Sequence, residues 1–174
     1  MYRDNRHIDF ISILNGLPAA VADIYGDGEH REINGTVRFY RAPRGVLVRA
    51  EISGLSAPVG RCESPVFGFH IHEGAKCSGR EGGSFSDTMA HYNPDGCPHP
   101  HHAGDLPPLF GNGGFAFSVF LTDRFTADEI IGRTVIIHSD PDDFTTQPSG
   151  NSGKKIACGE IRAYGRRGEL GQFF

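Results

Sequence analysis

Apolar residues alternate with polar residues along much of the chain, and this period of two is typical of strands that bury one face. The alternation predicts long strands at Ile33–Tyr40, Val46–Ile52 and Phe115–Leu121. It predicts further strands at 67–72, 134–138 and 157–164, with a weaker candidate at 21–25. Gly and Pro residues at 42–45 and 111–114 predict tight turns between neighbouring strands.

Seven or eight short strands at this spacing predict an all-β fold, an eight-stranded antiparallel Greek-key barrel or sandwich of immunoglobulin-like type. The stretches from Glu73 to Leu109 and from Ser139 to Lys155 are too long for hairpin loops. Because each follows a histidine-bearing strand, we expect two long functional loops. One short helix is predicted at 126–129, where Thr126 and Glu129 can form a capping box.

The chain length of 174 residues suits one domain with its own hydrophobic core. The 24 Gly and 11 Pro residues favour strands and turns over a helical bundle. We expect the domain at residues 31–165. An N-terminal extension with a possible first strand would occupy 1–30, and a C-terminal tail 166–174.

The net charge of −4, with scattered basic residues, gives no reason to expect a nucleic acid or a membrane as partner. No apolar stretch is long enough to span a bilayer, and residues 10–22 make a poor signal-peptide core. The default expectation is therefore a cytoplasmic protein, with an extracytoplasmic location left open. The four cysteines contain no Cys-x-x-Cys pair, which argues against a cysteine-only zinc site. Cysteine count alone leaves open two disulfides in any of three pairings, or four thiols.

Two histidine segments carry the candidate chemistry. His70 and His72 are two apart in a predicted strand, so their imidazoles point to the same side and can bind one metal or lie exposed. The second segment holds His91, His99, His102 and Asp105, and His138 ends another apolar run. Three imidazoles and a carboxylate can fill all four positions of a tetrahedral zinc ion. The alternative interpretation is a histidine-rich loop on the surface. Imidazole and carboxylate ligands suit copper and zinc.

These segments resemble those of the copper–zinc superoxide dismutases, of the bacterial type with a shortened zinc loop. The similar segments are 68–73, 91–94, 102–106, 132–138, 150–153 and 157–159, which follow the family's order within residues 33–163. The resemblance implies an enzyme that converts superoxide to dioxygen and hydrogen peroxide by Cu(II)/Cu(I) cycling. It also implies superoxide anion as the substrate and a possible homodimer.

Carried over residue by residue, the resemblance implies copper bound by His70, His72, His91 and His138, and zinc bound by His91, His99, His102 and Asp105. His91 would bridge the two metals and would leave copper and take up a proton during the cycle. The resemblance also implies a disulfide between Cys77 and Cys158, and a carboxylate at Asp142 that tethers one histidine of each metal.

The sequence departs from the family pattern at three places. Lys155 stands where the family has Arg, so it can attract superoxide but lacks the planar fork that docks it. The segment between His99 and His102 is shorter than in the family. The spacing from His91 to His99 matches the family, which favours His99 over His101 as the middle ligand. Cys62 and Cys97 are additional, as a second disulfide or as two thiols.

The competing function is a non-catalytic relative that binds copper or zinc on the same scaffold, or a domain with a degenerate site. A degenerate site would normally lack a copper ligand, and all four candidates are present in this chain. The sequence therefore favours the enzyme.

Overall fold

Two of the long alternating strands, at 33–40 and 46–52, bury their apolar face as the sequence pattern predicts, whereas in the strand at 115–121 the large apolar residues lie on the exposed face. The computed structural model describes residues 8–57, 60, 65–79 and 83–165, and the structural statements below concern these residues. The strands are β1 (Ala20–Gly26), β2 (Asn34–Ala42), β3 (Gly45–Ser53), β4 (Val66–Phe67), β5 (Phe69–His72), β6 (Leu109–Phe110), β7 (Phe115–Thr122), β8 (Thr134–His138) and β9 (Lys155–Ala163). Two short helical elements are α1 (Phe10–Asn15) and the 3₁₀ turn η1 (Ser86–Thr88).

Seven strands form one antiparallel sheet in the order β5-β8-β9-β1-β2-β3-β7, and β4 pairs with β6 in a second, two-stranded sheet. The predicted strand at 67–72 is interrupted at Gly68, which separates β4 from β5. Counted as one strand, these two give the expected total of eight among the described residues. The predicted all-β antiparallel fold is confirmed.

The possible first strand is present and lies inside the sheet rather than at its margin. Strand β1 pairs with β2 from Ala20 opposite Phe39 to Tyr25 opposite Asn34. On its other side, β1 pairs with β9. Residues 20–26 therefore belong to the same sheet as the rest of the domain.

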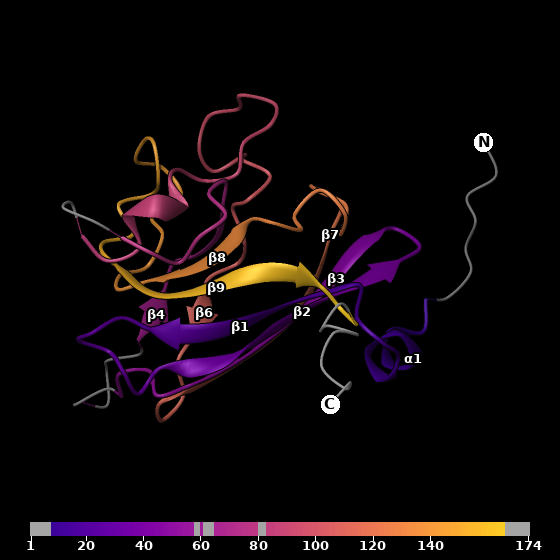
Figure 1. Cartoon of the computed structure of the whole chain (residues 1–174), viewed down its shortest axis with the longest axis horizontal. Helices are drawn as coiled ribbons and strands as arrows, with labels where there is room; N and C mark the ends of the chain where they lie inside the picture. The colour runs from indigo at the N-terminus through magenta and orange to yellow at the C-terminus, as the bar shows by residue number, and fades with distance from the viewer. Residues whose placement is uncertain (1–7, 58–59, 61–64, 80–82, 166–174) are drawn as a thin grey trace, which may run out of the picture.

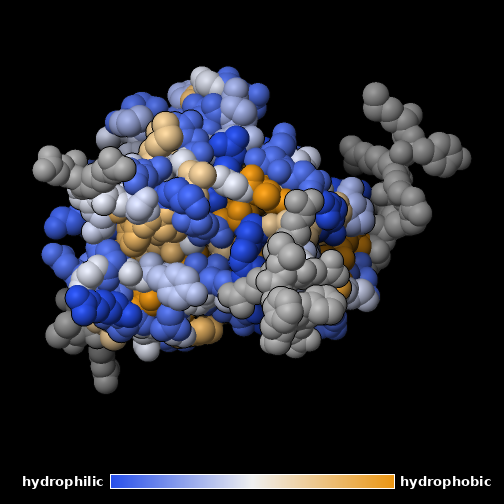
Figure 2. Space-filling model, viewed as in Figure 1, coloured by the Kyte–Doolittle hydropathy of each residue, from blue (hydrophilic) through white to orange (hydrophobic). Residues whose placement is uncertain are grey.

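The core is built from the inward residues of these strands. Ile24, Val37, Phe39 and Ile52 are fully buried on β1, β2 and β3, and Ile71 on β5 joins the same cluster. Figure 2 shows a surface that is mostly hydrophilic on one face of the molecule, with small hydrophobic patches between the polar regions.

Two local predictions have different outcomes. The turn at 42–45 is confirmed, since Ala42 pairs with Gly45 across a two-residue connection between β2 and β3. The helix at 126–129 is wrong, because residues 127–132 form turns. The Thr126 amide does donate to the Glu129 carboxylate at 2.5 Å, so half of the capping box forms without a following helix. Helix α1 was not predicted; its cap is Asp9, which accepts from the Ser12 amide.

Both predicted long loops are present and gather at one end of the sheet, at the left and top of Figure 1, whereas α1 lies at the opposite end. The first connects β5 to β6 and contains η1, and the second connects β8 to β9. The described residues include no helix that is both long and apolar enough to cross a bilayer.

Candidate metal centre

The histidines of β5 stand at the edge of the main sheet. β5 pairs with β8 on one side only, with His70 opposite Ile136 and His72 opposite Thr134. Its other edge is covered by the first long loop: the Ile71 amide donates to Gly104 O at 2.9 Å, and the Tyr92 amide donates to Ile71 O at 2.8 Å. The loop therefore binds β5 as an irregular extra strand, which brings its own histidines beside His70 and His72.

Gly104 makes this close approach possible. A β-carbon at this position would lie 2.2 Å from Ile71 O, closer than two such atoms can approach. The residues on either side of this contact carry the candidate ligands, since His72 bridges to His91 and His70 bridges to Asp105 in the same ladder-like arrangement. A side chain at Gly104 would push the loop, with its ligands, off the strand edge.

Four histidines from three elements converge at this edge. His70, His72, His91 and His138 are all buried, and one candidate ligand atom from each lies within 4.8 Å of the others. The Nε2 atoms of His72 and His138 face each other at 3.4 Å. His138 is the last residue of β8, where the register of β8 against β9 shifts.

A second group shares His91. It contains His91, His99, His102 and Asp105, all buried and again with ligand atoms within 4.8 Å of one another. Asp105 Oδ1 lies 2.8 Å from His91 Nδ1 and 3.3 Å from His102 Nδ1, and Asp105 Oδ2 lies 3.1 Å from His99 Nδ1. Four ligands at about 2.0 Å from a tetrahedral ion would lie about 3.3 Å apart, so this spacing fits a zinc ion.

Ring nitrogen atoms without a hydrogen-bond partner mark the sides of the histidines that face the candidate metals. Among the described residues, His70 Nδ1, His91 Nε2, His99 Nδ1 and His102 Nδ1 are buried without a hydrogen-bond partner. A buried polar atom without a partner is costly, and native proteins rarely leave one. Each of these atoms points into one of the two groups, which is the arrangement expected of lone pairs that bind a cation.

Asp142 contacts one histidine of each group, on the side of the ring opposite the candidate metal. Its side chain is 1% exposed; Oδ2 lies 2.8 Å from His70 Nε2, and Oδ1 lies 2.9 Å from His99 Nε2. Both histidines thus donate from Nε2 and keep Nδ1 free for a metal. Burial alone would raise the pKa of Asp142, but hydrogen bonds from His70, from the Phe144 amide and from His99 outweigh it and lower the pKa to about 2. The carboxylate stays ionised at neutral pH.

Gly150 provides the space for this tether. A β-carbon there would lie 1.9 Å from Asp142 Oδ1 and 2.7 Å from His99 Nε2. The backbone also has a φ of +67° at this residue, which glycine adopts without the steric cost that other residues bear. The glycine-rich segment of the second long loop therefore seats Asp142 against His99.

Burial favours the neutral form of four of the six candidate imidazoles. Desolvation lowers the pKa of His138 to about 3 and lowers the pKa of His72 well below its usual value. It also lowers the pKa of His70 and of His102, against the opposing effect of nearby carboxylates. A neutral imidazole is the form that binds a metal, so the fold supplies these four ligands already deprotonated.

A cavity of about 500 Å³ opens onto the first group and is lined by His72, His91, His138, Glu73 and Lys155. Lys155 Nζ donates to Thr88 Oγ1 at 2.8 Å and to Met89 O at 2.9 Å, so the ammonium is held at the wall of this cavity. The same Met89 carbonyl accepts from His72 Nδ1 at 2.9 Å, so His72 Nε2 is the nitrogen that faces His138 in the first group. Burial lowers the pKa of Lys155.

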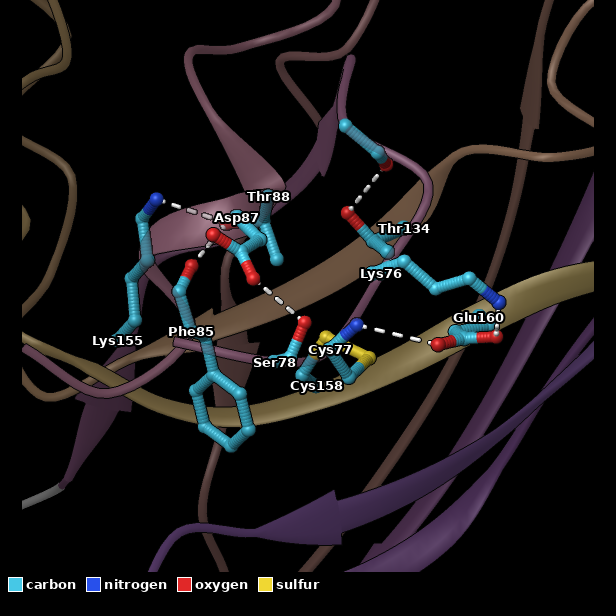
Figure 3. The surroundings of a disulfide bond; sticks show 11 residues. Lys76, Cys77, Ser78, Phe85, Asp87, Thr88, Thr134, Lys155, Cys158 and Glu160 are labelled. Carbon is cyan, nitrogen blue, oxygen red and sulfur yellow. Dashed lines mark hydrogen bonds and ion pairs between the residues drawn. A yellow bond between two sulfur atoms is a disulfide. The ribbon is translucent and has the colours of Figure 1, made fainter. Parts of the chain in front are cut away.

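The disulfide expected from the resemblance is confirmed. Cys77 in the first long loop is bonded to Cys158 on β9, with Cα atoms 5.7 Å apart (Figure 3). Glu160, two residues further along β9, accepts from the Cys77 amide and pairs with Lys76. The loop is thus anchored to the sheet ahead of η1 and of the second histidine segment.

Each predicted site residue has a clear place. His99 is buried in the second group, whereas His101 is exposed and belongs to neither group. Cys97 is a free cysteine, so the structure does not form the second disulfide, one of the two alternatives for Cys62 and Cys97. Cys62 lies outside the described residues. Sequence reasoning missed two residues that contact the second histidine segment, Arg124 and Gln147, because neither belongs to a metal-ligand residue type.

An antiparallel β fold that carries two buried ligand sets with one shared imidazole defines a class of binuclear metalloproteins. The family model described as copper/zinc superoxide dismutase (SODC) matches residues 33–161. The chain belongs to this family.

Individual relatives agree with the family match. The chain is 35% identical over 168 residues to "Superoxide dismutase [Cu-Zn]" of Deinococcus radiodurans, covering 85% of this chain and 86% of the relative. It is 32% identical over 146 residues to "Superoxide dismutase [Cu-Zn] 2" of Aquifex aeolicus, covering 75% and 80%. The fold is similar to that of Cu/Zn superoxide dismutase from Brucella abortus, with a TM-score of 0.69 at 24% identity over 81% of this chain and 98% of that one.

Proposed function

We propose that the protein is a superoxide dismutase that holds copper and zinc in the two adjoining groups. The observation that carries the proposal is His91, a single imidazole that belongs to both ligand sets. An imidazolate can bind one metal through each ring nitrogen, and a shared ring has no purpose in a protein that stores a single ion. Family membership points to the same activity.

The residues fit the two metals differently. Four imidazoles in the first group, beside an open cavity, suit copper and leave access for a small substrate. Three imidazoles and one carboxylate in the second group suit zinc and leave no open position. Bound copper would supply one-electron chemistry by alternating between Cu(II) and Cu(I).

The chain's own residues would prepare the substrate and the proton. Lys155 places a positive charge at the cavity wall, where it attracts superoxide, an anion. His91 can carry a proton at Nε2, the nitrogen that has no partner, while its Nδ1 faces the zinc group, 2.8 Å from Asp105. Because the zinc group would hold the Nδ1 side of the ring, the imidazole would keep its position as Nε2 gains and loses the proton.

Superoxide consumption by the metal-loaded protein tests the proposal, with His138→Ala as the matched variant. We expect rapid consumption by the wild-type protein and its loss in the variant, since His138 contributes one of the four imidazoles and is 4% exposed. A wild-type rate no faster than that of buffer alone would leave the alternative, a non-catalytic copper- and zinc-binding protein. Metal analysis of the same sample completes the test, because full copper without zinc would refute the second site.

The oligomeric state, the cellular location and the absence of macromolecular partners stay predictions. A homodimer would be detected by light scattering of the purified protein, and a cytoplasmic location by cell fractionation. The absence of nucleic-acid and membrane partners is consistent with the net charge of −4 and is tested by binding assays with DNA and with anionic vesicles.

A further inference from the structure

The turn that carries three of the four zinc-site residues is held by side chains from outside it. This turn, residues 99–105, is called here the zinc turn; it contains His99, His102 and Asp105. It has few main-chain bonds of its own, such as the Asp105 amide to His102 O at 3.2 Å. Two residues distant in sequence, Arg124 and Gln147, contact its main chain.

Arg124 follows β7 and reaches beneath the zinc turn. Its Nη1 lies 3.1 Å from Pro100 O, 3.3 Å from His102 O and 3.1 Å from Asp105 O. Three carbonyl dipoles of one short turn therefore converge on a single cationic nitrogen. Hydrogen bonds from a charged donor are stronger than neutral ones, and a guanidinium keeps its charge at every physiological pH.

Gln147 approaches the opposite end of the turn from the second long loop. Its Oε1 accepts from the His99 amide at 3.0 Å, and its Nε2 donates to His99 O at 2.7 Å. A single side-chain amide thus satisfies both main-chain groups of His99, as a neighbouring strand would. This pairing fixes the backbone on both sides of the His99 ring, which must face Asp142 with Nε2 and Asp105 with Nδ1.

From these contacts, we propose that Arg124 and Gln147 are positioning residues that keep the zinc turn in its metal-binding shape and thereby set how tightly zinc is retained. The inference rests on the proposed zinc site. Neither residue contacts a candidate metal-binding atom; both act through the main chain of residues that do. The main chain of Gly104 is already bonded to Ile71 and Tyr92, and the two side-chain contacts add support at His99, Pro100, His102 and Asp105.

The experiment compares zinc release from the protein loaded with copper and zinc. The variants are Arg124→Lys, which keeps the charge but ends one bond short of the Nη1 position that contacts the three carbonyls, and Gln147→Glu, which keeps the shape but removes the donor to His99 O. Matched controls are Arg41→Lys, in an exposed ion pair with Asp128, and Asn151→Asp, an exposed amide in the same loop as Gln147.

We expect both variants to transfer zinc to a chromogenic chelator at least about tenfold faster than the wild-type protein, the usual effect of losing a group that orients metal ligands. Copper release and both controls should stay within about twofold of wild type. The absorption spectrum of Co²⁺ bound in place of zinc should also change in the variants, because their zinc turn is held less firmly. Unchanged zinc release with a lower melting temperature of the metal-free protein would show a purely structural role and overturn the proposal.

If Arg124→Lys does not fold, zinc release from Gln147→Glu decides the question alone. Superoxide consumption by the loaded wild-type protein is measured separately. An inactive wild type whose variants still lose zinc faster would refute the dismutase while supporting the positioning role. An active wild type whose variants retain zinc normally would refute the positioning role alone.

Discussion

Asp142→Asn should loosen both metals at once, because one carboxylate orients a histidine of each group. The substitution preserves the size of the side chain but removes its charge and replaces one acceptor oxygen by an NH₂ group. That group cannot accept from a histidine N–H, so one of His70 and His99 loses its acceptor, and the other keeps only a neutral oxygen in place of a charged one. Both histidines bond to Asp142 at 2.8 and 2.9 Å in the structure.

The size of the effect follows from the pKa of Asp142. Its fall from 3.8 to about 2 reports how strongly the site prefers the ionised form. At about 1.4 kcal/mol for each pKa unit, the preference is about 2–3 kcal/mol, and the side chain is too buried for solvent to screen it. One charged hydrogen bond is worth about 1.5–3 kcal/mol, so the two values agree. We expect metal affinity to fall by about 10–100-fold.

Competition with a chelator, followed separately for copper and zinc, measures this loss. Asp143→Asn is the matched control, since Asp143 is adjacent, exposed and accepts from Thr145 and Thr146 in its own turn rather than from a histidine. Wild-type affinity for both metals in Asp142→Asn would refute the reasoning. Equal losses in both variants would show that the loop as a whole, rather than the tether, had been disturbed.

Lys155→Ala should slow superoxide consumption and weaken its dependence on salt, because the variant removes the ammonium held at the cavity wall; an unchanged rate and salt slope would exclude this role. Cys77→Ser should destabilise the protein by about 4–5 kcal/mol, the chain-entropy estimate for a bridge that spans 81 residues, and calorimetry would show a lower melting temperature. The metal-free protein should lose stability as pH falls below 6.5, because histidines of the unfolded chain then bind protons, whereas the buried histidines of the folded chain stay unprotonated. With the pKa of His138 lowered to about 3, this residue alone accounts for about 2 kcal/mol between pH 7 and pH 5. Thermal denaturation at pH 7, 6 and 5 checks this, and a melting temperature independent of pH would contradict it.

The strands could be predicted from sequence because apolar and polar positions alternate along them, but the alternation does not say which face is buried. In β7 the large residues Phe115, Phe117 and Val119 are exposed, and Ala116 on the other face is buried. Strand β1 was a weak prediction for a physical reason. Its first three residues are all buried, so its pattern lacks the polar alternation of a half-exposed strand. The interruption between β4 and β5 at Gly68 could not be predicted from sequence either, because it depends on hydrogen bonds with Asp140 and His138, about 70 residues away.

The candidate ligands were predictable because imidazole and carboxylate are chemically distinctive and their spacing is informative. Residues that act through the main chain give no such signal. Gln147 and Arg124 could stand on any polar surface, and only the folded chain brings them to the carbonyls and the amide of the zinc turn. The contact of Gly104 with Ile71 is likewise invisible until the loop is placed against β5.

Burying the candidate ligands costs folding free energy, and this cost explains why the chain around the site is so firmly anchored. Histidines such as His70 and His91 are buried with nitrogen atoms that have no hydrogen-bond partner, which in a metal-free protein opposes folding. The costly atoms lie where other constraints hold the chain in place: β5 and β8 are paired, the disulfide anchors the first loop, and Asp142 ties the two loops together. A rigid sheet edge with two anchored loops can therefore keep unpaired nitrogen atoms in position, whereas a flexible loop would turn them toward water.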